Sequence, residues 1–204
     1  MRRLIGILCV ILGVSFLFGS GGVVVYNRIE SELARDSSLA LLESIKEIIE
    51  ETSGEGNLPQ SQKPAVDAVD KDQRKMPTVT IDGDECIGYV SIPALALELP
   101  VLTGWSYEKL NKAPCHYYGS YFDKDFVIAG HNYTSHFGGL SALRSGDVIV
   151  FNAVDGKRYY YEVVLTETLP GEATAEMIES GFDLSLYTCT LGGGSRVTVR
   201  CNKR

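Results

Sequence analysis

Cys189 and Arg196 flank a short glycine-rich segment near the end of the sequence. On both sides of that segment apolar and polar residues alternate, which is typical of two β-strands joined by a tight turn. If Gly192 and Gly193 form a two-residue turn, the antiparallel register places Cys189 directly across from Arg196, with Cβ atoms about 5 Å apart. A guanidinium beside a thiol favours the thiolate and stabilises a developing oxyanion. A shift of the register by one residue would break this pairing. The alternative to a catalytic pair is a buried structural cysteine and a surface arginine.

His131 follows the β-type run 126–130 and opens a loop that contains glycine. Catalytic groups are common at such strand ends, although a plain polar residue is the alternative. A cysteine, a histidine and an arginine supply the nucleophile, the proton shuttle and the oxyanion support that acyl transfer through a thioester needs. The sequence does not show that His131 lies near Cys189. Arg200 shares a strand face with Arg196 and is the alternative arginine.

These residues belong to a segment, 81–204, that is dense in short β-type runs separated by turn residues. Asp155-Gly156 between two of the runs is a strong hairpin signal. Helical patterns are limited to 107–112 and 174–179. Many short strands with few helices predict a closed or nearly closed β-barrel. The predicted strands are 87–92, 126–129, 147–152, 158–165, 184–190 and 196–201.

The first residues read as a membrane element. No charged residue occurs from Leu4 to Tyr26, a run long enough to cross a bilayer as a helix. Arg2 and Arg3 precede it, so a single-pass helix with a cytoplasmic N-terminus is expected for residues 1–26. The alternative is a signal peptide that is cleaved near the glycines at 19–22. Both interpretations place the remaining chain outside the cytoplasm.

Residues 27–80 are predicted to form a helical stalk and a flexible linker. An apolar stripe at three-to-four spacing predicts a helix over 29–51, with acidic and basic residues on its other side. We favour an amphipathic spacer over a helix that packs or dimerises. Proline, glycine and polar residues without periodicity over 53–78 are typical of a linker.

Composition limits the possible classes of function. The chain has 204 residues, of which 45% are hydrophobic, and a formal net charge of −7. This apolar content excludes disorder of the whole chain, and the acidic charge gives no general reason to bind nucleic acid. Five cysteines are too few for a disulfide scaffold. With Cys189 free, Cys86, Cys115 and Cys201 allow at most one disulfide among themselves.

The other two histidines suggest no metal site. His116 and His136 have no zinc-binding spacing with His131, and we expect both to be solvent-exposed loop residues. No acidic cluster singles out a calcium site. We therefore expect neither a metal nor a cofactor.

The segment from about residue 86 to 201 resembles the sortases, the cysteine transpeptidases of Gram-positive cell surfaces. A Leu-x-Thr-Cys signature with an upstream Gly-His and a downstream arginine is specific for that family. The N-terminal anchor and linker are similar to the usual family layout as well. The resemblance rests on Gly88-Tyr89-Val90-Ser91-Ile92-Pro93, Leu99-Pro100-Val101, Val127-Ile128-Ala129-Gly130-His131-Asn132 and Leu186-Tyr187-Thr188-Cys189-Thr190, followed by Arg196.

This resemblance implies a mostly β fold, a closed eight-stranded barrel with short helices. It implies that Cys189 attacks the Thr–Gly bond of a Leu-Pro-x-Thr-Gly-like sorting signal, with His131 as acid and base and Arg196 holding the oxyanion. The partners it implies are surface proteins with that signal and an amine acceptor, such as a peptidoglycan precursor or a pilin lysine. The chain would be anchored in the cell membrane with its catalytic domain outside.

Departures from the family pattern bear on the subclass, and two alternative functions remain to be weighed. The short connection after Cys189 and the absence of an Asp-Pro-aromatic lid over 53–80 favour class D or a related clostridial-type branch, although His131-Asn132 is similar to class B. An L,D-transpeptidase-like enzyme is one alternative, but Tyr187-Thr188-Cys189 lacks the Ser-x-Gly-Cys signature of those enzymes. A catalytically inactive, membrane-tethered binding module is the other.

Overall fold

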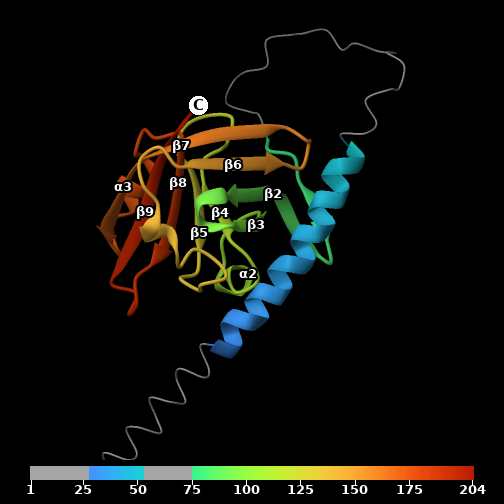
Figure 1. The fold of residues 1–204 in the computed structure, drawn as a ribbon, viewed down its shortest axis with the longest axis horizontal. Helices are drawn as coiled ribbons and strands as arrows, with labels where there is room; N and C mark the ends of the chain where they lie inside the picture. Colours follow the sequence, from blue (N-terminus) through green and yellow to red (C-terminus); the bar gives the residue numbers. More distant parts are fainter. Residues whose placement is uncertain (1–27, 53–74) are drawn as a thin grey trace, which may run out of the picture.

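The computed structural model describes residues 28–52 and 75–204 of the chain (Figure 1). The predicted anchor, 1–26, and residues 53–74 of the predicted linker lie outside these ranges. Within the described ranges, no helix is both long enough and apolar enough to cross a membrane. The division into anchor, stalk and barrel therefore stays a prediction.

One sheet runs through the whole of 75–204 and closes on itself. Its order is β1-β2-β3-β4-β5-β8-β9-β7-β6, and β6 pairs back onto β2. Eight strands, β2 to β9, thus form a closed barrel as predicted, while β1 pairs with the start of β2 outside the ring. The strands are β1 (Val79–Ile81), β2 (Asp84–Ile92), β3 (Leu97–Leu102), β4 (Cys115–Tyr118), β5 (Phe126–Gly130), β6 (Val148–Ala153), β7 (Arg158–Pro170), β8 (Leu184–Cys189) and β9 (Ser195–Lys203).

The predicted strands correspond to β2 and to β5 through β9, and the predicted helical segments correspond to α2 (Tyr107–Leu110) and α3 (Thr174–Ile178). Two further 3₁₀ turns are η2 (Pro93–Leu95) and η3 (Leu140–Ala142). Strands β1, β3 and β4 were not among the predicted ones. β3 contains Pro100, and β4 has only four residues with an irregular register, so neither gives a clear alternating pattern.

Apolar side chains from every strand of the ring except β4 fill the barrel interior. Tyr121 and Phe126 pack against Phe151 there, with ring centroids 5.1 Å apart in each pair. On β8 the buried Leu184 and Leu186 belong to the same interior cluster. Because side chains alternate along a strand, the interior leucines direct Cys189 to the outer face of the barrel.

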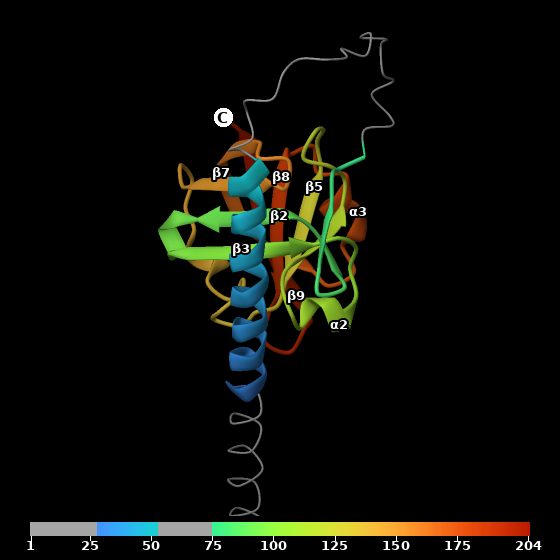
Figure 2. The same cartoon turned by 90° about the vertical axis from the view of Figure 1, so that its right-hand side faces the viewer.

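A helix over residues 28–52 packs along the outside of the barrel beside β2 and β3 (Figure 2). Leu41 and Ile45 are buried in a second apolar cluster that includes Leu102 of β3. Lys46 forms an ion pair with Glu98. The preferred interpretation of this segment as a mere spacer is wrong, because the barrel itself buries its apolar stripe.

Candidate active site

Cys189 is the last residue of β8, and it lies directly across from Arg196 of β9. The predicted register is therefore confirmed. One step closer to the turn, the Thr190 N–H donates to the Ser195 carbonyl at 2.8 Å. Hydrogen-bonded and non-hydrogen-bonded pairs alternate in an antiparallel ladder, so Cys189 and Arg196 form a non-hydrogen-bonded pair, in which side chains approach most closely.

The connection between β8 and β9 is longer than the predicted two-residue turn. The Gly193 N–H donates to the Thr190 carbonyl at 2.9 Å. Gly192 and Gly193 have φ values of 89° and 74°, which glycine adopts without strain. The additional residues, Leu191 and Gly194, lie on either side of this glycine pair, so the register of the strands is unchanged. The side chain of Leu191 is 94% exposed at the tip.

Strand β5 brings His131 to the same end of the barrel. β5 runs parallel to β8, and Gly130, the last residue of β5, pairs with Thr188. His131 and Cys189 are the next residues along these two chains, and neighbouring strands lie about 4.8 Å apart. The structure therefore brings the predicted histidine and cysteine together at the C-terminal ends of adjacent parallel strands.

Backbone contacts fix the position of His131. The Phe137 N–H donates to the His131 carbonyl at 3.0 Å, and the Phe137 ring is buried in the barrel interior. A Cβ atom on Gly130 would lie 2.5 Å from that ring. Only glycine permits this approach, which gives a physical reason for the Gly-His pair: the loop after His131 folds back over the end of β5.

Two side chains orient the imidazole of His131. Its Nε2 lies 2.9 Å from Oδ1 of Asn111, which caps the C-terminus of α2, so Nε2–H donates to the amide oxygen and Nδ1 is left as the basic nitrogen. The ring of Tyr133 packs on the imidazole at a centroid distance of 4.7 Å. Burial lowers the pKa of His131, and the negative charge of Glu30 partly opposes this shift. At neutral pH the imidazole is therefore mostly neutral.

The two candidate arginines differ in their surroundings. The guanidinium of Arg196 lies over the Tyr187 ring, 5.6 Å from its centroid, and is partly exposed. Arg200 is 2% exposed, and its Nε donates to Glu167 at 2.8 Å. It also donates to Ser185 Oγ and to two carbonyls of α3. These contacts occupy Arg200, so Arg196 is the arginine that is free to meet a substrate at Cys189.

Cys189 differs from the other described cysteines in its access to solvent. Cys189 is exposed, whereas Cys86, Cys115 and Cys201 are buried, and none of these four cysteines forms a disulfide. Burial raises the pKa of Cys86 and of Cys115 to about 12, and it also raises the pKa of Cys201. Their thiols stay protonated at neutral pH and have no path to a substrate.

The remaining histidines are not exposed loop residues, which corrects the expectation from the sequence. His116 lies in β4, half-buried, and its Nε2 donates to the Gly119 carbonyl at 2.9 Å. His136 is fully buried beside the Ala34 backbone of the N-terminal helix. Over 28–52 and 75–204, no group of three or more histidine, cysteine, aspartate or glutamate side chains could hold a metal ion.

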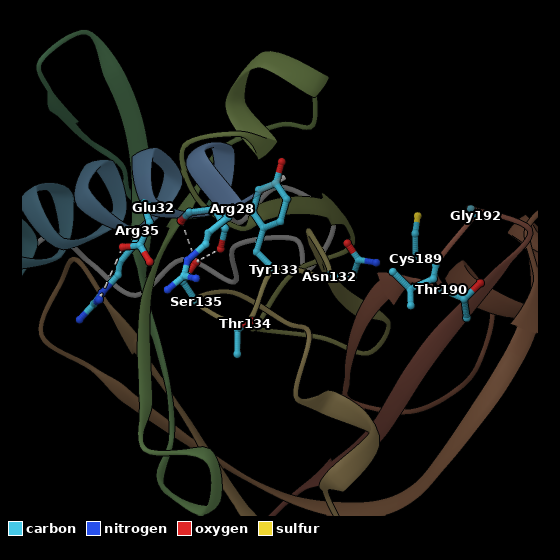
Figure 3. Close-up of a pocket in the computed structure, with 13 residues that line it drawn as sticks. Arg28, Glu32, Arg35, Asn132, Tyr133, Thr134, Ser135, Cys189, Thr190 and Gly192 are labelled. Atoms are coloured by element: carbon cyan, nitrogen blue, oxygen red, sulfur yellow. Dashed lines mark hydrogen bonds and ion pairs between the residues drawn. The ribbon is translucent and has the colours of Figure 1, made fainter. Parts of the chain in front are cut away.

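Cys189 opens onto a cavity of about 950 Å³ (Figure 3). Three segments form its walls: the hairpin tip 190–193, the loop 132–135 that follows His131, and the first turns of the N-terminal helix. In Figure 3, Asn132 and Tyr133 lie between Cys189 at one end and the helix residues at the other. The helix contributes Arg28, Ser31, Glu32 and Arg35.

Sequence reasoning missed Asn111, Tyr133 and the helix residues of the cavity. Asn111 lies in a helix cap far upstream of His131, and no motif links the two positions. Tyr133 follows His131 by two residues, a spacing that carries no signal in a loop. The amphipathic stripe of residues 29–51 was visible in the sequence, but the surface that it covers was not.

The arrangement suits acyl transfer. An exposed thiol can serve as a nucleophile, an oriented imidazole at the end of the adjacent strand can exchange protons, and a guanidinium across the strand pair can stabilise an oxyanion. The neighbouring cavity has room for a peptide-sized group next to the thiol.

Comparison with known proteins agrees with this chemistry. A family model described as the Sortase domain matches residues 90–204. No curated protein matches the chain. Among solved structures, sortase C1 of Streptococcus agalactiae is 28% identical, with a TM-score of 0.53 over 61% of this chain and 70% of that one. Sortase C1 of Streptococcus suis is 27% identical, with a TM-score of 0.52 over 58% of this chain and 73% of that one.

A sortase D5 transpeptidase of Clostridium perfringens covers more of the molecule. Its TM-score is 0.59, over 83% of this chain and 99% of that one. At 18% identity this likeness concerns the fold alone. Because the similar structures include sortases C1 and D5, they do not single out one class.

Proposed function

Because the chain belongs to the sortase family and is a cysteine transpeptidase, we propose that Cys189, His131 and Arg196 are its catalytic residues and that its substrate is a Leu-Pro-x-Thr-Gly-like sorting signal. The observation that carries this proposal is the pairing of Cys189 with Arg196 at the barrel end where His131 follows β5. Nucleophile and oxyanion ligand then come from the adjacent strands β8 and β9, and the proton carrier directly follows β5 of the same barrel.

The first half-reaction forms a thioester. The Cys189 thiolate attacks the Thr carbonyl carbon of the Thr–Gly bond, and the carbonyl oxygen becomes an oxyanion that the Arg196 guanidinium stabilises. When the C–N bond breaks, the imidazolium of His131 gives its proton to the leaving glycine amine. Because burial lowers the pKa of His131, the imidazolium is the minor form at neutral pH, and only a fraction of the enzyme is ready for this step.

The second half-reaction transfers the acyl group to an amine. The neutral His131 takes a proton from the incoming amine, whose nitrogen attacks the thioester carbonyl. The C–S bond then breaks, the Cys189 thiolate is restored, and a new amide joins the sorted protein to its acceptor. Water in place of the amine gives hydrolysis.

We also propose that residues 1–26 anchor the chain in the cell membrane, with the barrel outside the cytoplasm. Support comes from the uncharged run between Leu4 and Tyr26 and from the two arginines before it. A membrane anchor would hold the catalytic site close to substrates that emerge at the cell surface.

The test uses the full-length chain in detergent, a library of Leu-Pro-x-Thr-Gly peptides and a triglycine amine. We expect mass spectrometry to detect both the free Gly-containing fragment and the peptide joined to triglycine. Cys189→Ala should give neither product. A binding module would give no product with any peptide, and this outcome would overturn the proposed function. An L,D-transpeptidase-like enzyme would act instead on peptides with a D-amino acid at the cleaved bond.

A further inference from the structure

Arg28 and Arg35 of the N-terminal helix line the same cavity as Cys189 (Figure 3). In a chain of net charge −7, this cavity is bounded by two arginines and a single carboxylate. That carboxylate, Glu32, lies 3.8 Å from the Arg35 guanidinium in an exposed pair. Among the described residues, no carboxylate forms an ion pair with Arg28. The helix end of the cavity, across Asn132 and Tyr133 from Cys189, thus has excess positive charge among its lining residues.

Contacts with the barrel hold the helix that carries these two arginines. Ser135 Oγ donates to the Ser31 carbonyl at 3.2 Å, and the Tyr133 hydroxyl donates to Glu30 at 3.3 Å. Further along, Lys46 pairs with Glu98. The helix is therefore held against the barrel near both of its ends, which places Arg28 and Arg35 at one end of the cavity.

The cavity extends from Cys189 along the loop that follows His131. The loop 132–135, directly after His131, forms one of its walls. Among the described residues, neither His131 nor Arg196 lines the cavity, so its relation to His131 rests on this loop. The leaving amine and the incoming amine both exchange a proton with His131, so both must occupy the His131 side of the thioester. The oxyanion points instead toward Arg196.

We propose that this cavity binds the amine acceptor, and that Arg28 and Arg35 select an acceptor that carries carboxylates a few residues from its amine. The inference rests on the proposed function and adds the chemical class of the second substrate. Arginine pairs with carboxylates through two parallel hydrogen bonds, which gives direction as well as attraction. A volume of about 950 Å³ accommodates several residues of an acceptor peptide.

The test compares two acceptor peptides of equal length with the full-length chain and one sorting peptide. Both start with three glycines and end in an amide. One continues with two glutamates and the other with two glutamines. We expect kcat/KM for the glutamate peptide to exceed that for the glutamine peptide by about tenfold at low salt, with the preference shrinking as salt screens the charges.

The ratio of the two kcat/KM values is the readout for each variant. It should fall to about one in the double variant Arg28→Gln, Arg35→Gln. In Arg28→Lys, Arg35→Lys it should be smaller than in the wild type but stay above one, because lysine keeps the charge and loses the two parallel hydrogen bonds. Arg158→Gln is the matched control, because Arg158 is an exposed arginine outside the cavity, and it should keep the wild-type ratio. Equal use of the two peptides by the wild type, or an unchanged ratio in the double glutamine variant, would overturn the inference.

Two further arms separate this inference from the proposed function. If the glutamine substitutions change KM for the sorting peptide and leave the acceptor ratio intact, the cavity binds the sorting signal and the inference is wrong. Failure to form a hydroxamate with hydroxylamine and any sorting peptide would overturn the proposed function alone. In that case the arginines are still tested by the binding of fluorescently labelled glutamate and glutamine acceptor peptides to full-length Cys189→Ala. Tighter binding of the glutamate peptide supports the inference, and equal binding contradicts it.

Discussion

Arg196 and Arg200 share one face of β9 but meet opposite surroundings. Arg196 is partly exposed across from Cys189, whereas Arg200 is 2% exposed and donates to Glu167, Ser185 and the backbone of α3. The same residue type on the same strand face thus serves two purposes. Arg196 is available for chemistry, and Arg200 ties α3 to the barrel.

Substitution of these two arginines should separate activity from stability. Arg196→Ala removes the cation beside the developing oxyanion, and we expect kcat/KM to fall about 10²-fold or more with little change in the free energy of unfolding. Arg200→Ala leaves buried partners unsatisfied and should lower the free energy of unfolding by about 2–4 kcal/mol. Peptide cleavage kinetics and urea unfolding of both variants check this. Comparable loss of stability in the two variants would contradict the assignment.

Asn111 is expected to be a positioning residue for His131. Asn111→Asp places a negative charge on the atom that Nε2 faces, which stabilises the imidazolium and should raise the pKa of His131. The histidine limb of the pH profile of kcat/KM should move to higher pH by the same amount, and NMR titration of the imidazole checks the assignment. Asn111→Ala should lower kcat without moving the limb upward. A profile that is unchanged in Asn111→Asp would show that the contact does not orient the catalytic imidazole.

His136 should make the fold sensitive to acid. Burial lowers the pKa of His136 from 6.5 to about 4, and the nearby His131 adds to this shift. Between these values the unfolded state binds a proton that the folded state does not, so the free energy of unfolding falls as the pH drops from 6.5 toward 4. The full contribution is about 3 kcal/mol. In His136→Phe the loss of stability over this pH range should be smaller than in the wild type. Denaturant unfolding at several pH values would contradict the prediction if both chains showed the same slope.

The sequence was informative where the relevant contacts are local. The β8–β9 register followed from a turn centred on Gly192 and Gly193, because a short glycine-rich connection leaves few ways to pair Cys189. The sequence alone did not exclude a shift of one residue, which the structure does. The Asp155-Gly156 hairpin was also predictable, because this dipeptide is typical of a tight turn between two strands. β6 and β7 pair on either side of it.

The rest of the site depends on contacts between distant segments. His131 reaches Cys189 through the parallel pairing of β5 with β8, and no local pattern specifies which strands become neighbours. Asn111 and Tyr133 orient the imidazole through side-chain contacts that periodicity does not encode. His136 stands in a polar stretch and reads as exposed, but the N-terminal helix covers it. An amphipathic stripe predicts that its apolar side chains are buried, but it does not identify the surface that buries them.

If Cys189 carries the acyl group, the mass of the trapped enzyme reveals it. Full-length chain should be mixed with a Leu-Pro-x-Thr-Gly peptide without an amine acceptor, quenched in acid and digested for mapping. We expect a thioester adduct with the mass of the peptide up to its threonine, located on Cys189 and discharged by hydroxylamine, and no adduct in Cys189→Ala. An adduct on Cys86, Cys115 or Cys201, or product formation by Cys189→Ala, would contradict it.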